Sequence, residues 1–360
     1  MDLASTHPPL VVVVGGGGVG KTTLAAALGL VSAGAGLRTL VMTFDPSLRL
    51  KDALGVGVAA KDLAVTVPGT DGGAAGAGRL DASLLDARVT FDRLVARYAP
   101  DEAARQRILT NPYYDHLAGH LGGILEYMAV ERLYEVAREG RYDRIILDTP
   151  PTSQAIEFLG APQRIVDFLD SGALKIALKD WFDDRGHLRA APSSLGFLSR
   201  GIEKFLDRVV GVQLLRDMSE FFRAFAPLFT GFRQRAERTK ELLVSSETLF
   251  VLVTGPGESR IPDTLFFARR LRETGHHLGP VVVNRLHPQL AAGDAAVEDG
   301  GRRLFHWLGE RHRRGFEELR TLMSPDQTLV ALPLTPDELT DLESLTAFGR
   351  RFQQAVSAAS

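Results

Sequence analysis

Short runs of apolar and β-branched residues recur along the chain, and segments with helical spacing separate them. Six runs stand out: Leu10–Val14, Thr39–Phe44, Arg144–Leu147, Leu249–Thr254, Val281–Asn284 and Thr328–Leu332. Leu63–Val67 is a weaker candidate for a further strand. Because runs without polar alternation bury both of their faces, they are typical of parallel strands that helices cover on each side. The pattern predicts an α/β fold with a doubly wound, mainly parallel sheet.

Residues 160–245 lack such runs and carry apolar side chains at helical spacing instead. Two sets show this spacing: Leu198, Ile202, Phe205, Val209 and Val212, then Met218, Phe222, Phe225, Phe229 and Phe232. We therefore predict an α-helical insertion at 161–245 between two parts of a core, 1–160 and 246–360. Its phenylalanines fit either ordinary core packing or an apolar groove for a helix of another protein.

Two further segments have a local signature. Gly69–Gly78 reads GTDGGAAGAG, which predicts a surface loop without chemistry of its own. Near the end of the chain, Thr335 is followed by a proline and then by Glu338, and leucines recur at helical spacing after them. This pattern predicts a core-facing final helix that Thr335 caps.

Composition narrows the class of protein. The chain has 360 residues, 45% of them apolar and none of them cysteine, which excludes disulfides and thiolate-held metals and suits a reducing compartment. The formal net charge is −2, and neither a basic stripe nor an amphipathic basic tail is visible, so we expect no nucleic-acid partner. No apolar stretch reaches about 18 residues, so we expect no integral membrane segment and a cytoplasmic protein.

The strongest chemical signal is GGGGVGKTT, which follows the first predicted strand and precedes a helical pattern. It satisfies the phosphate-loop motif G-x-x-x-x-G-K-[ST], whose backbone N–H groups surround phosphate oxygens. Lys21 would reach the β- and γ-phosphates, and Thr22 would offer Mg²⁺ a hydroxyl. The predicted nucleotide-binding residues here are Gly15, Gly16, Gly17, Gly18, Val19, Gly20, Lys21, Thr22 and Thr23.

Two carboxylates end predicted strands, at the sheet edge where α/β proteins bind ligands. Asp148 follows Arg144–Leu147 and is the predicted second Mg²⁺ residue, although a helix cap is an alternative. Asp45 follows the second strand and is the candidate that orients or deprotonates the attacking water, so Asp45 and Lys21 are the predicted catalytic residues. Asp52 is more often a solvated helix residue than a ligand. The segment Thr149–Gln154 is either a switch that responds to the γ-phosphate or a rigid turn.

Asn284 ends the strand Val281–Val283, and its side-chain amide can both donate to and accept from the edge of adenine. A guanine site normally adds an aspartate three residues later. Position 287 is histidine, which favours ATP over GTP, and His287 itself is expected on the surface.

The segments GGGGVGKTT, TFDPSLRLKDALG, LDTPPTSQAIEFL, VVVNRLHP and ALPLTPDELTDLESL together resemble the ATPase family of the arsenical pump and of tail-anchored-protein targeting, especially its bacterial branch. The resemblance implies that Asp45 belongs to switch I, that Asp148 with Thr149–Gln154 forms switch II, and that Asn284 and a loop around Pro333 border the adenine. It also implies a dimer with a helical subdomain for a client protein.

The chain departs from that family at several points. Gly16 stands where the family usually has a signature lysine, which leaves a cation such as Arg49, or a lysine-bearing homologue in a heterodimer, to supply the charge. Without cysteine there is neither thiolate capture of arsenite nor an interfacial zinc, and the helical insertion is rich in phenylalanine rather than methionine. The predicted function is an ATP- and Mg²⁺-dependent switch, as a homodimer or heterodimer, for a protein client that presents an apolar helix. The alternative is an ATP-binding assembly or scaffold protein with slow or lost hydrolysis.

Overall fold

The computed structural model describes residues 7–44, 49–56, 64–67, 70, 78–111, 124–171, 224–289 and 300–359. The chain divides into two compact units, one formed by 1–86, 132–159 and 241–360 and the other by 87–131 and 160–240. The predicted insertion, 161–245, overlaps the second unit, which also takes in 87–131. Its assignment as a client-binding subdomain stays a prediction.

The first unit is built on an eight-stranded sheet in the order β3-β4-β2-β5-β1-β6-β7-β8. The strands are β1 (Leu10–Gly15), β2 (Arg38–Thr43), β3 (Val65–Thr66), β4 (Arg79–Leu84), β5 (Arg144–Asp148), β6 (Thr248–Thr254), β7 (Leu278–Leu286) and β8 (Leu329–Pro333). All neighbours are parallel except β3 and β4, which pair antiparallel. The six strong strand predictions are confirmed, and the weak run Leu63–Val67 contains β3.

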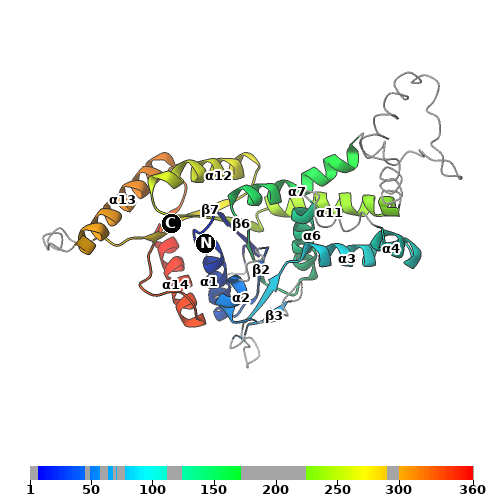
Figure 1. Ribbon diagram of the computed structural model, residues 1–360, viewed down its shortest axis with the longest axis horizontal. Helices are drawn as coiled ribbons and strands as arrows, with labels where there is room; N and C mark the ends of the chain where they lie inside the picture. Colours follow the sequence, from blue (N-terminus) through cyan, green and yellow to red (C-terminus); the bar gives the residue numbers. More distant parts are fainter. Residues whose placement is uncertain are drawn as a thin grey trace, which may run out of the picture. The chain divides into compact units, whose positions relative to one another are not determined.

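Helices cover both faces of this sheet, as the unalternated strands require (Figure 1). Figure 1 shows α1 and α14 on one face and α12 and α13 on the other. The helices of this unit are α1 (Lys21–Gly34), α2 (Arg49–Leu54), η3 (Glu258–Arg260), α12 (Ile261–Glu273), α13 (Gly300–Leu322) and α14 (Leu342–Ala359). One core cluster joins Val11 and Val13 of β1 to Leu28 of α1 and to Phe348 and Phe352 of α14. The fold is therefore a doubly wound α/β fold, as predicted.

The sequence pattern missed β4, because polar residues interrupt it. Asp81 and Ser83 are nonetheless 2% and 3% exposed. The Asp81 carboxylate accepts hydrogen bonds from Arg79 Nε at 2.7 Å and from the Tyr142 hydroxyl at 2.9 Å. A buried carboxylate is tolerated when partners of this kind compensate its lost hydration. Together with burial, that contact raises the pKa of Tyr142.

The predicted start of the final helix is wrong, although its packing is confirmed. Thr335 donates to the Asp337 carbonyl at 2.9 Å and the helix α14 begins only at Leu342. Asp341 caps it, because its carboxylate accepts from the Ser344 N–H at 2.7 Å, and this bond lowers the pKa of Asp341. Leu345 and Phe348 then enter the core as expected.

The described residues of the second unit are helical. The helices are α3 (Ala87–Tyr98), α4 (Glu102–Leu109), η2 (Ala226–Leu228), and parts of α6 (Ile124–Glu139), α7 (Thr152–Asp170) and α11 (Phe229–Val244). The last three cross from one unit into the other along the chain. The loop Gly69–Gly78 and most of the apolar stripe from Leu198 to Phe222 lie outside the described residues, apart from Thr70 and Gly78.

The described end of the phenylalanine stripe packs into the core of the second unit. Phe225 and Phe232 are 8% and 4% exposed, and their ring centroids lie 5.2 Å apart. Phe91 of α3 stacks on Phe225 at 5.5 Å. Beside them Arg235 forms an ion pair with fully buried Glu131 at 2.5 Å. For these residues the structure favours ordinary core packing over an open groove.

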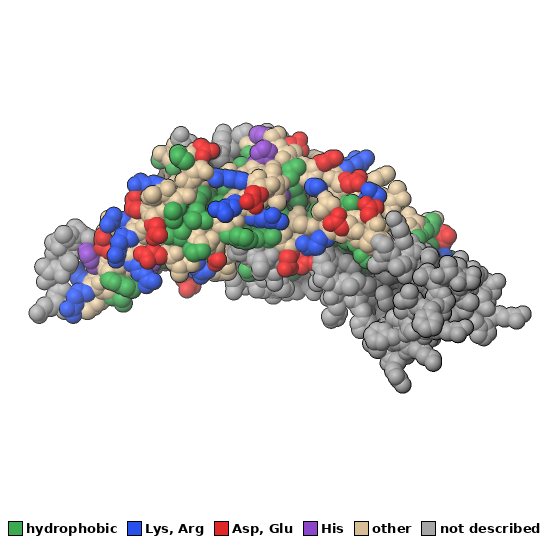
Figure 2. Space-filling model, turned by 90° about the horizontal axis from the view of Figure 1, so that it is seen from above, with side chains coloured by type: hydrophobic (Ala, Val, Ile, Leu, Met, Phe, Trp, Pro, Cys, Tyr) green, Lys and Arg blue, Asp and Glu red, His purple; other side chains and the backbone are tan. Residues whose placement is uncertain are grey.

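Helix α13 is amphipathic and rich in arginine, which the sequence analysis did not identify. Leu304, Phe305 and Trp307 are each at least half exposed, and Arg311 lies over the Trp307 ring at 5.2 Å. Figure 2 shows positive and negative side chains interspersed over the described part of the face it presents. Among the described residues, no helix is apolar over a stretch long enough to cross a membrane.

Candidate functional site

The phosphate-loop motif lies between β1 and α1, at the carboxyl edge of the sheet. Strand β1 ends at Gly15, where an added Cβ would meet the Val253 carbonyl oxygen at 1.9 Å, so only glycine fits against β6. Helix α1 begins at Lys21, after Gly20 with φ 95°. The N-terminus of α1 therefore faces the loop, and its free N–H groups and dipole favour a bound anion.

Lys21 lies against the loop that precedes it. It is 7% exposed, and its ammonium Nζ donates to the Gly16 carbonyl oxygen at 2.8 Å. The contact holds the cation inside the loop, where it is positioned to meet phosphate oxygens.

Thr22 and Asp148 come together, as the sequence predicted for two residues of one metal site. The Thr22 hydroxyl donates to Asp148 Oδ2 at 2.7 Å. Asp148 is 1% exposed and ends β5, whose neighbour β1 leads into the loop. Thr43, which sequence reasoning missed, donates to the same Oδ2 at 2.9 Å from the end of β2. Its position two residues before Asp45, at the end of a parallel strand, is the signal that could have identified it.

The segment after Asp148 is fixed at its first residue. Thr149 is 2% exposed, and both its N–H and its hydroxyl donate to the Val13 carbonyl, at 3.2 and 2.9 Å. Helix α7 begins at Thr152. A conformational change of this segment in response to the γ-phosphate would therefore begin after Thr149.

Asn284 is 5% exposed and lies against the phosphate loop. Its side-chain N–H donates to the Val19 carbonyl at 2.9 Å, and its Oδ1 accepts from the Arg285 N–H at 2.9 Å. One N–H and one lone pair of the amide remain beyond these two bonds, which is what the edge of adenine requires. Arg285, which sequence reasoning did not single out, donates to the Gly18 carbonyl at 3.1 Å.

Pro333 ends β8 beside the end of β7. It is exposed and lies opposite Leu286 in the pairing of the two strands. His287 Nδ1 lies 3.2 Å from His312 Nδ1 of α13, which makes it half-buried rather than a free surface residue. Burial, with the neighbouring His287 and Arg311, lowers the pKa of His312. Asn284, Pro333 and this histidine pair thus share one end of the site.

Other predicted residues cannot be placed in full. Asp45 lies outside the described residues, and of Arg49 and Asp52 the structure describes the backbone in α2 but not the side chains. Gly16 lies in the loop with no side chain to supply a charge. Among the described residues, no three His, Asp or Glu side chains gather into a metal-binding cluster.

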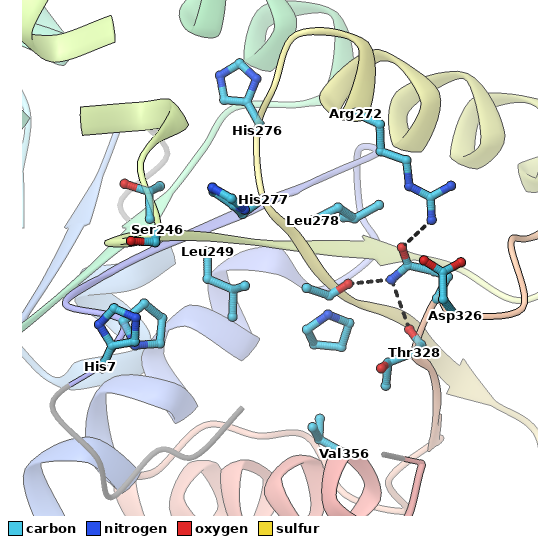
Figure 3. Close-up of a pocket in the computed structure, with 15 residues that line it drawn as sticks. His7, Ser246, Leu249, Arg272, His276, His277, Leu278, Asp326, Thr328 and Val356 are labelled. Carbon is cyan, nitrogen blue, oxygen red and sulfur yellow. Dashed lines mark hydrogen bonds between the residues drawn. The ribbon is translucent and has the colours of Figure 1, made fainter. Parts of the chain in front are cut away.

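A separate cavity of about 620 Å³ lies at the opposite, amino edge of the sheet (Figure 3). Thr248, Leu278 and Thr328 line it at the starts of β6, β7 and β8. Arg272 on its rim donates to Gln327 at 2.7 Å, so this cation already has an acceptor. Parallel strands place Gly15 at the far end of β1, so this cavity is not part of the phosphate-loop site.

Comparison with known proteins agrees with this geometry. The model of the anion-transporting ATPase family matches residues 9–182, which include the phosphate loop, Asp45 and Asp148. The chain is 23% identical over 343 residues to an Aquifex aeolicus protein named as an arsenical pump-driving ATPase, across 93% of this chain and 76% of that protein.

Two other relatives match over shorter stretches. Protein Rv2184c of Mycobacterium tuberculosis is 36% identical over 154 residues, which cover 41% of this chain and 36% of that protein. The ATPase get3 of Schizosaccharomyces pombe is 30% identical over 163 residues, or 44% of this chain and 45% of that protein. The match to these two thus spans less than half of their length. Residues 9–182, a little under half of this chain, thus match the anion-transporting ATPase family.

Proposed function

We propose that the chain binds ATP with Mg²⁺ at the phosphate loop and couples its hydrolysis to the opening and closing of a dimer. The observation that carries this proposal is the 2.7 Å contact between Thr22 and Asp148. It brings the hydroxyl that follows the motif lysine to a buried carboxylate at the end of the neighbouring strand. A hydroxyl and a carboxylate next to a phosphate loop are what P-loop ATPases use for their metal ion.

The donor set fits Mg²⁺, because this ion prefers oxygen ligands and is commonly held by one or two side chains together with substrate phosphates. Thr22 and Asp148 would hold it. When bound, Mg²⁺ supplies positive charge that offsets the charge of the phosphates. Lys21 would bind the β- and γ-phosphates, since it already points its ammonium into the loop.

Two other roles are proposed from positions at the ends of strands. Asp45 would orient the attacking water, because it comes two residues after Thr43, which ends β2 and donates to Asp148. Asn284 and Pro333 would border the adenine, because they end the adjacent strands β7 and β8. The amide of Asn284 then keeps one donor and one acceptor for the base while its other groups bind Val19 and Arg285.

The wider role in the cell is a proposal from the family. An ATP-driven switch, as a homodimer or with a homologous partner, would act on a protein client with an apolar helix and work in the cytoplasm. A role in arsenite transport is not proposed, because the sequence has no cysteine to bind arsenite. The second candidate, an ATP-binding scaffold with slow hydrolysis, is favoured by Gly16, which removes the family's lysine.

The test compares ATP affinity with and without Mg²⁺ in the parent and in Asp148→Asn. The change keeps the size of the side chain and one acceptor for Thr22 but removes the charge that would hold the metal. We expect ATP binding without Mg²⁺ to stay near the parent, and the gain in affinity on adding Mg²⁺ to fall by about tenfold or more, the scale of a charged contact.

Asp143→Asn is the matched control. Asp143 immediately precedes β5, at the end of the strand opposite to Asp148, and accepts a hydrogen bond from Arg38. It should respond to Mg²⁺ as the parent does. An unaltered Mg²⁺ effect in Asp148→Asn would contradict the metal assignment. Measurable turnover in the parent supports the switch, whereas tight binding without turnover supports the scaffold.

A further inference from the structure

Two consecutive residues at the end of β7 hold two consecutive carbonyls of the phosphate loop. Asn284 Nδ2 donates to the Val19 carbonyl at 2.9 Å, and Arg285 donates to the Gly18 carbonyl at 3.1 Å. In a trans peptide the C=O and the following N–H point in opposite directions. Fixing these two carbonyls against β7 therefore aims the N–H groups of Val19 and Gly20 away from β7. These are donors of the loop that would surround phosphate oxygens.

The backbone at Arg285 is unusual. Its φ is 62°, and among the described residues it is the single non-glycine residue with positive φ. Residues other than glycine rarely adopt this left-handed conformation, and arginine has no short polar side chain that would stabilise it locally, as Asn or Asp has. A glycine would fit the same backbone at lower cost.

The cause of this conformation lies in the pairing of β7 with β8. Val283 pairs with Ala331, but Leu286 pairs with Pro333, so β7 carries one residue more than β8 between these pairs. Such a bulge bends the strand and re-aims a side chain, and a left-handed residue is one of its common forms. Here the re-aimed side chain is that of Arg285, which reaches back to Gly18.

We propose that Arg285 is a positioning residue for the nucleotide: it fixes the peptide between Gly18 and Val19 and so orients the Val19 N–H for phosphate. The proposal rests on ATP binding at the loop. It explains why arginine occupies a bulge position that favours glycine. It also assigns Arg285 no contact with the reacting atoms, because its side chain donates to the loop backbone.

Two substitutions separate the side chain from the backbone. Arg285→Gly removes the guanidinium and suits the left-handed φ, so the variant should unfold at the parent's temperature or above it. If the side chain positions the loop, its affinity for Mg·ATP and for Mg·ADP should fall about tenfold, the scale of one hydrogen bond from a charged donor. Because the loop would bind phosphates equally in ground and transition states, the loss should lie in KM more than in kcat.

Arg285→Lys keeps a cation at the position and should recover part of the affinity. Arg350→Gln on α14 is the control for loss of an exposed arginine and should bind as the parent does. Parent-like affinity in Arg285→Gly would overturn the proposal. Lys21→Ala distinguishes the two levels: if Lys21→Ala binds Mg·ATP like the parent, the proposed nucleotide site itself fails. If it loses binding while Arg285→Gly does not, only the role of Arg285 fails.

Discussion

Gly20 offers the sharpest test of how the loop is held. A Cβ added at this residue would lie 2.4 Å from Asn284 Nδ2, and φ at Gly20 is +95°. Gly20→Ala therefore meets two obstacles, an unfavourable backbone conformation and a clash with the side chain that binds Val19. Either the loop changes its path or Asn284 moves and gives up its hydrogen bond.

Both effects can be given a size. A non-glycine residue in a sparsely populated backbone region costs about 1–3 kcal/mol. Loss of the hydrogen bond from Asn284 to Val19 adds about 1 kcal/mol. Together they give about 2–4 kcal/mol against the loop conformation, which corresponds to a loss of roughly 30- to 1,000-fold in ATP affinity.

The assay is equilibrium titration with Mg·ATP, with Gly34→Ala as the matched control. Gly34 ends α1, outside the loop, where an added Cβ would meet nothing within 4 Å and φ is not positive. We expect Gly34→Ala to change the affinity by less than about threefold, the size of a surface substitution.

A double substitution identifies the contact that matters. In an Asn284→Ala background the clash and the hydrogen bond are already absent, so Gly20→Ala should cost about fivefold less in affinity than in the parent. Parent-like affinity in Gly20→Ala, or an equal loss in Gly34→Ala, would refute the reasoning. Full additivity of the two losses in affinity would show that Asn284 does not interact with the side chain added at Gly20.

Three further predictions follow from other residues. Asp45→Asn should keep ATP affinity but lower turnover by about a hundredfold, the scale of a positioned base, and parent-like turnover would assign the water to another residue. Gly16→Lys, or mixing with a lysine-bearing homologue, should raise the ATPase rate of the purified chain; fast hydrolysis without either would refute a need for that lysine. Burial lowers the pKa of His276 from 6.5 to about 4, so the unfolded chain binds a proton first as pH falls and stability drops between these values. His276→Asn should remove up to about 3 kcal/mol of this acid sensitivity in pH-dependent denaturant unfolding, and unchanged acid sensitivity in this variant would refute the assignment.

The sequence predicted the carboxyl edge of the sheet well because that edge depends on local signals. A strand followed by a glycine-rich loop, and a carboxylate at the end of another strand, are visible without knowledge of the fold. The contact between Thr22 and Asp148 follows once β1, which leads through the loop to Thr22, and β5, which ends at Asp148, are assigned to adjacent parallel strands. Fold class and the candidate metal residues were therefore within reach.

What the sequence could not show depends on contacts that form only in the folded chain. β4 was not predicted because Asp81 interrupts its apolar pattern, and the hydrogen bonds from Arg79 and Tyr142 that stabilise this buried carboxylate are visible only in the structure. The prediction that Thr335 caps the final helix was wrong because Asp341 is another good capping residue and lies closer to the core-facing residues. The bulge at Arg285 likewise depends on the pairing of β7 with β8, which one strand cannot reveal.

The order of the strands in the sheet determines which pairings can form while the chain is still being made. β1 is made before the other described strands of the sheet, yet Leu10 pairs with Ile145 on one side and with Thr248 on the other. Pairings between such distant segments form slowly and leave intermediates with unpaired strands. The hydrogen bonds to the Val19 and Gly18 carbonyls of the phosphate loop can form only after Asn284 and Arg285 have been made. A nascent chain shorter than this carries the motif of the nucleotide site without the strand that shapes it.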